Sequence, residues 1–71
     1  MYIHIYNYEL EELTSIKIKN EDSYIYELCK DFAENKYSIL DELEQMDIYV
    51  DESTSEVFCT EDKLVINNIT I

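Results

Sequence analysis

The residues of this chain best suited to recognition chemistry are the carboxylates between Tyr37 and Asp62, a stretch without a single Lys or Arg. The acids of this stretch are Asp41, Glu42, Glu44, Asp47, Asp51, Glu52, Glu56, Glu61 and Asp62. Like charges at this density repel one another across a compact surface, so they oppose folding. A positively charged partner would offset that repulsion. We therefore expect these acids, with Tyr49 as an aromatic anchor among them, to contact such a partner.

The same bias extends over the whole chain of 71 residues, which carries a net charge of −12 with five cations, all of them Lys. Proteins that bind nucleic acids directly need clustered Lys and Arg side chains. Anionic membrane surfaces disfavour an acidic chain for the same electrostatic reason. The sequence therefore excludes direct nucleic-acid and membrane binding, and it indicates a basic protein surface as the partner.

Catalytic and metal-binding side chains are sparse. His4 is the only imidazole, and the two cysteines, Cys29 and Cys59, lie far from it and from each other in sequence. A metal site or a catalytic base needs partners at suitable spacing, which these residues lack. Residues 51–56 are acidic, but a calcium loop of the EF-hand type requires a Gly, and this chain has none. We expect no catalytic residue, no metal and no cofactor, and hence no enzyme.

Targeting signals are also missing from the sequence. Met1 is followed at once by an alternating strand pattern without a basic leader, and no apolar stretch approaches the ~20 residues of a membrane span. Two cysteines do not make a disulfide framework. We therefore expect a cytoplasmic protein. The frequent Ile, Tyr, Asn, Lys, Glu and Asp are served by A/T-rich codons, which favours a bacterial host of low GC content or its phage.

The elements that must position the acids begin with two strands. Residues 2–8 alternate, with Ile3 and Ile5 on one face and Tyr2, His4, Tyr6 and Tyr8 on the other. Residues 9–15 read as a polar connection, and residues 16–19 as a second strand that pairs with the first in a hairpin. Because Gly is absent, we expect the connection to be longer than a two-residue turn.

Two helices are expected to follow. Residues 20–23 supply capping side chains, and Ile25, Leu28, Cys29 and Phe32 then form one apolar face. Asn35 interrupts this pattern, and Ile39, Leu40, Leu43 and Met46 resume it out of phase. The sequence thus predicts two helices joined near Asn35, the second capped by Ser38. Asp41, Glu44 and Asp47 would share one face of that second helix, and Cys29 would be buried.

The remainder reads as three short strands, at residues 48–50, 57–60 and 64–71. The predicted fold is a single acidic α+β domain over residues 1–71, with the order β-β-α-α-β-β-β. It has a small antiparallel sheet of about four to five short strands, and the two central helices pack on one face. Such a small domain has a thin stability margin. Burying an exposed strand edge in a homodimer would help it, so that assembly stays open.

In size and acidity the chain resembles phage-encoded DNA-mimic inhibitors, including anti-CRISPR and anti-restriction proteins. The resemblance implies a small inhibitor, encoded by a phage or mobile element, that blocks the basic nucleic-acid channel of an enzyme in the host cell. A CRISPR effector or a restriction enzyme is the first target to consider. One alternative is an immunity protein or antitoxin that neutralises a basic nuclease toxin. Another is a small structural homo-oligomer whose acidity serves only solubility.

Overall fold

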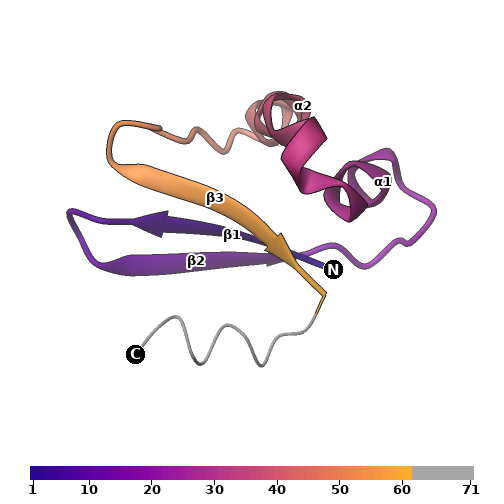
Figure 1. Ribbon diagram of the computed structural model, residues 1–71, viewed down its shortest axis with the longest axis horizontal. Helices are drawn as coiled ribbons and strands as arrows, with labels where there is room; N and C mark the ends of the chain where they lie inside the picture. The colour runs from indigo at the N-terminus through magenta and orange to yellow at the C-terminus, as the bar shows by residue number, and fades with distance from the viewer. Residues whose placement is uncertain (62–71) are drawn as a thin grey trace.

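Three strands and two helices form an α+β arrangement in the computed structural model, which describes residues 1–61 (Figure 1). The elements in chain order are β1 (Tyr2–Asn7), β2 (Glu12–Lys17), α1 (Tyr24–Lys30), α2 (Phe32–Gln45) and β3 (Ser55–Thr60). The sheet is antiparallel, and β1 lies between β2 and β3. The predicted fold class and the antiparallel sheet are confirmed, whereas the described residues form three strands rather than four or five.

The first two strands form the expected hairpin, closed by the four residues 8–11. The side-chain oxygen of Asn7 accepts a hydrogen bond from the Leu10 backbone N–H at 3.0 Å, and Glu11 has a positive φ of 53°. The second strand begins at Glu12, so the prediction of a connection up to residue 15 is wrong. Thr14 and Ser15 are exposed on this edge strand, and pairing with β1 makes them strand residues although they carry no apolar alternation.

The helices are two in number, as predicted, and Ser23 caps the first by accepting a hydrogen bond from the Tyr26 backbone N–H at 3.2 Å. They meet at Asp31 rather than near Asn35, so Ser38 lies inside α2 and caps nothing. The Asn35 side chain donates to the Leu28 carbonyl at 3.3 Å, which satisfies a backbone group at the end of α1. That role explains why a polar residue interrupts the apolar pattern there.

The end of α2 accounts for the residues that were predicted as a strand, 48–50. The Ile48 N–H donates to the Leu43 carbonyl at 2.9 Å, and the Asp47 N–H donates to the Glu44 carbonyl at 3.0 Å. Asp47 has φ 61°, the left-handed conformation of a Schellman C-cap. The chain therefore terminates a helix where a strand was expected. The strand predicted at residues 64–71 lies outside the described residues.

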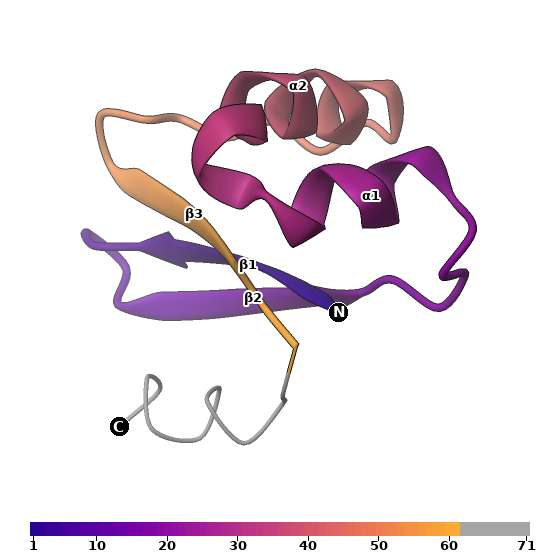
Figure 2. The same ribbon diagram turned by 45° about the vertical axis from the view of Figure 1, so that its right-hand side comes forward.

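Both helices cover the same face of the sheet (Figures 1 and 2). The core between the two layers consists of Ile3, Leu28, Cys29, Ile39, Leu43 and Val57. Directly paired residues share a face of the sheet, so Cys59 lies beside Ile3 on the inner face, while His4 and Phe58 lie on the outer face. Within residues 1–61, neither helix has the length and apolarity needed to cross a bilayer.

Candidate functional site

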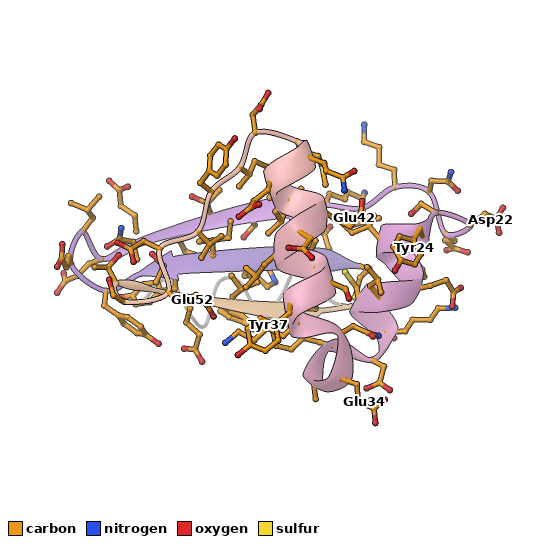
Figure 3. The ribbon with its side chains drawn as sticks, turned by 90° about the horizontal axis from the view of Figure 1, so that it is seen from above. Asp22, Tyr24, Glu34, Tyr37, Glu42 and Glu52 are labelled. Atoms are coloured by element: carbon orange, nitrogen blue, oxygen red, sulfur yellow. The ribbon has the colours of Figure 1, made fainter. Side chains whose placement is uncertain are left out.

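The side of α2 that faces away from the sheet carries four exposed residues at spacings of three, four and three. They are Glu34, Tyr37, Asp41 and Glu44, and we call them the outer stripe. This spacing places them on one helical face, opposite the fully buried Ile39 and Leu43. Figure 3 shows the helical side of the molecule, with Glu34 and Tyr37 on α2. Tyr37 is 73% exposed, as is Tyr49 in the segment after the helix, so most of its ring is open to a partner.

The outer stripe is a linear array of negative charge with an aromatic ring inside it. Glu44 lies ten positions after Glu34, which corresponds to a rise of about 15 Å along the helix axis. One strand of DNA carries about four phosphates over that distance. The three carboxylates of the stripe therefore supply a comparable, slightly sparser row of anions. Tyr37 adds a flat, amphipathic contact surface that is suited to a protein interface.

Two of the predicted contact residues, Asp41 and Glu44, belong to the outer stripe. Asp47 does not, because α2 ends at Gln45 and Asp47 lies beyond the C-cap. Glu42 is half-buried and projects from the side of α2 that faces α1 (Figure 3). Tyr49 is 73% exposed in the segment after the helix, outside regular secondary structure. The prediction that Asp41, Glu44 and Asp47 share one helical face is thus wrong for its third member.

The acids of the loop before β3 have partners within the chain. The Asp51 carboxylate accepts hydrogen bonds from the Ser53 hydroxyl at 2.6 Å and from the Ser53 N–H at 3.0 Å. These bonds lower the pKa of Asp51, because they favour its charged form. Glu52 lies 3.3 Å from the Lys36 ammonium. Lys36 precedes the cation-free stretch in sequence, yet the fold places it against that stretch.

Glu56 lies on β3 and is not part of the outer stripe. It pairs with Tyr6 on the outer face of the sheet, and its carboxylate accepts a hydrogen bond from the Tyr8 hydroxyl. That bond raises the pKa of Tyr8. Glu61 is exposed just after β3, and Asp62 lies outside the described residues. The predicted acids therefore do not form one continuous surface.

A hollow of about 240 Å³ lies between α2 and the beginning of β3. Its lining residues are Tyr8, Lys36, Glu52, Ser55, Glu56 and Val57. The ion pair between Lys36 and Glu52 neutralises part of its charge, and Glu56 is engaged by Tyr8. Since its charged groups already have partners within the chain, the hollow is a weaker candidate than the outer stripe.

Ion pairing leaves most of the acidic charge uncompensated. Asp62 is outside the described region, so sixteen of the seventeen acids can be placed. Within residues 1–61 two of them form ion pairs, Glu27 with Lys30 at 3.2 Å and Glu52 with Lys36 at 3.3 Å. The carboxylates of the outer stripe form none in this part of the chain. The carboxylates of the stripe are therefore available to an external cation, as are the exposed hairpin acids Glu9, Glu11 and Glu12.

His4 has a structural role that sequence reasoning did not reveal. Its ring is fully buried in the central strand, with Nδ1 2.8 Å from the Ser15 hydroxyl and Nε2 2.7 Å from the Thr60 hydroxyl. The neutral ring donates from one nitrogen and accepts at the other. A Ser–His pair is also found in nucleophilic enzymes, but there a carboxylate stabilises the imidazolium. Here the second partner is a neutral hydroxyl, and the side chain instead links all three strands.

The buried imidazole predicts a loss of stability in mild acid. Burial lowers the pKa of His4 below its ordinary value of 6.5, so the unfolded chain takes up the proton first. Stability is therefore complete above pH 6.5 and falls as the pH drops below that value. Carboxyl groups ordinarily titrate near pH 4, outside this window. Chemical denaturation at pH values from about 7.5 to 5.5 should show the decline, and the variant His4→Gln should not. An equal decline in the variant would assign the effect to other groups.

Comparison with protein families, with curated proteins and with solved structures finds no match for this chain. Among residues 1–61, no group of three or more His, Cys, Asp or Glu side chains is placed to hold a metal ion. Sequence reasoning missed Glu34, because the cation-free stretch begins only after Lys36. Counting back seven residues from Asp41, two helical turns, would have found it.

Proposed function

We propose that this protein binds a basic, nucleic-acid-binding protein through the outer stripe and prevents that protein from engaging nucleic acid. The observation that carries the proposal is the position of Tyr37, 73% exposed between the carboxylates of Glu34 and Asp41 on one helical face. A face that served only solubility would gain nothing from such a ring. A face that docks against a protein gains contact area and a polar tip from it.

The electrostatic part of the mechanism follows from the charge distribution. Carboxylates that form no ion pair within residues 1–61 create a negative field that accelerates encounter with a Lys/Arg-lined channel. Complementary charges fix orientation and association rate, whereas buried aromatic anchors determine how slowly the complex dissociates. In the complex the acidic row would occupy the place of phosphates. The protein would thus inhibit by occupying the channel, without catalysis.

The partner that this surface would suit is an enzyme with a cationic nucleic-acid channel, and a CRISPR effector or a restriction enzyme is the first choice. If this protein were instead an immunity protein that neutralises a basic nuclease toxin, it would use the same outer-stripe residues. The two functions differ in the identity of the target. A panel of purified targets therefore separates them.

The test is competition between this protein and fluorescent duplex DNA for a purified CRISPR effector, a restriction endonuclease and a nuclease toxin. We expect the duplex to be displaced from one of them. We expect the triple variant Glu34→Gln, Asp41→Asn, Glu44→Gln to associate with that target roughly tenfold more slowly at low ionic strength. The difference should shrink as salt is added, because salt screens exposed charges.

A matched control distinguishes the outer stripe from net charge. The hairpin carries three exposed acids, and the variant Glu9→Gln, Glu11→Gln, Glu12→Gln removes the same number of charges. We expect this control to retain most of the association rate. Equal slowing by both variants would show that only net charge matters. Full activity of the stripe variant would exclude the stripe as the contact surface.

A further inference from the structure

The two cysteines come from distant parts of the sequence but meet in the core. Cys29 lies on the buried side of α1, and Cys59 lies on the inner face of β3 beside Ile3. Cys29 is 3% exposed, and Cys59 is partly buried and packs against the core cluster that contains Cys29. Both are free thiols. Both thiols therefore lie in the core between α1 and β3, and a bond between them would join a helix to a strand of the sheet.

The two thiols are also chemically unequal. A hydrogen bond from the Cys59 thiol to the Cys29 sulfur lowers the pKa of Cys29, and the same bond raises the pKa of Cys59. Only the thiolate is an effective nucleophile. Cys29 is thus the sulfur that reacts first, and Cys59 is the thiol placed beside it. Redox-sensitive cysteines are often placed next to a resolving cysteine in this way.

We propose that Cys29 and Cys59 form a reversible intramolecular disulfide when the protein meets a hydroperoxide, and that this bond locks α1 to β3. The inference is independent of the function proposed above. It concerns the state of the scaffold that carries the outer stripe.

The reaction needs two steps. The Cys29 thiolate attacks one peroxide oxygen, the O–O bond breaks, and the alcohol or water leaves with a proton, which gives Cys29 sulfenic acid. The Cys59 sulfur then attacks the Cys29 sulfur, the S–S bond forms, and the sulfenic hydroxyl leaves as water with the Cys59 proton. Two thiols lose two electrons and two protons in all, and the peroxide is reduced.

The consequence for the molecule is a closed loop from residue 29 to residue 59, which contains the whole of α2. A cross-link of this length removes much of the conformational freedom of the unfolded chain. We expect the oxidised protein to melt at least about 10 °C above the reduced protein. Dithiothreitol should restore both thiols and the original melting temperature.

The experiment treats the reduced full chain with hydrogen peroxide and then with N-ethylmaleimide under denaturing conditions, followed by intact mass spectrometry. The expected product is a monomer that has lost two hydrogen atoms and takes up no maleimide. The variant Cys59→Ser should instead stop at oxidised Cys29, which a dimedone probe traps. Wild-type protein in urea provides a readout that does not depend on a variant folding. Once Cys29 is oxidised there, its sulfenic acid should persist longer before the intramolecular bond forms than it does in the native protein.

Three results would overturn the proposal. The first is complete maleimide labelling of both cysteines after peroxide treatment, when free glutathione added to the same tube as a positive control has been oxidised. The second is a product that consists only of disulfide-linked dimers. The third is a cross-linked monomer whose melting temperature equals that of the reduced protein, because the bond would then not lock the two elements.

Discussion

Replacing Tyr37 with alanine is expected to accelerate dissociation from the proposed target by roughly 30-fold or more. Central aromatic residues of protein interfaces commonly contribute at least about 2 kcal/mol, and that value corresponds to a factor of about 30 in affinity. The association rate should hardly change, because the substitution removes no charge. Surface plasmon resonance with the immobilised target, at one fixed salt concentration, separates the two rates.

A second tyrosine offers the control for this experiment. Tyr24 on α1 is 63% exposed, nearly as much as Tyr37, but it lies outside the outer stripe (Figure 3). The variant Tyr24→Ala should leave both rates within about twofold of the wild type, because residues outside the centre of an interface contribute little binding energy. If Tyr24→Ala accelerates dissociation and Tyr37→Ala does not, the contact surface is centred on α1.

The two kinds of substitution also test the mechanism against simple charge attraction. Replacing the carboxylates with neutral amides should lower the association rate, and this effect should disappear in high salt. Tyr37→Ala should instead raise the dissociation rate at every salt concentration. A purely electrostatic interaction would leave Tyr37 without influence. A purely apolar interaction would leave the carboxylates without influence. The proposed function requires both effects in the same complex.

The features that the sequence predicted correctly depend on neighbours along the chain. The alternation of residues 2–8 predicted β1, the polar side chains before Tyr24 predicted the Ser23 cap, and the spacing around Cys29 predicted its burial. Each of these patterns is local, because a strand or a helix places residues two, three or four apart on one face. The α+β class follows from the same patterns.

The features that were missed depend on contacts between distant segments. Nothing near Lys36 in sequence indicates that it pairs with Glu52, and nothing near His4 indicates hydroxyl partners on both neighbouring strands. Asn35 was read as a helix boundary because its capping of the α1 carbonyl of Leu28 is a tertiary contact. The acidic stretch was mispredicted for the same reason. Its residues are continuous in sequence, but the fold divides the described ones among several surfaces.

Leu43 is one of the residues whose truncation should strongly destabilise the free protein. Its side chain projects from α2 toward the sheet and is fully buried. Its carbonyl accepts a hydrogen bond from the Ile48 N–H at the end of the helix. Replacing a buried Leu with Ala commonly costs 2–5 kcal/mol, so we expect a loss of about 3 kcal/mol for Leu43→Ala. A domain of this length typically has a total stability of roughly 4–11 kcal/mol. The variant should therefore lose a large part of its stability, which urea denaturation would measure.

Gln45 provides the control on the same turn of α2, because it is exposed and lies near the same end of the helix. Gln45→Ala should change stability by no more than about 0.5 kcal/mol, since alanine is a strong helix former and no packing is lost. The contrast tests the phase of α2 directly. If Gln45→Ala were the more damaging substitution, the helix would be rotated, and the outer stripe would then face the sheet instead of a partner. The stability of the free protein thus decides whether Glu34, Tyr37 and Asp41 are available for binding.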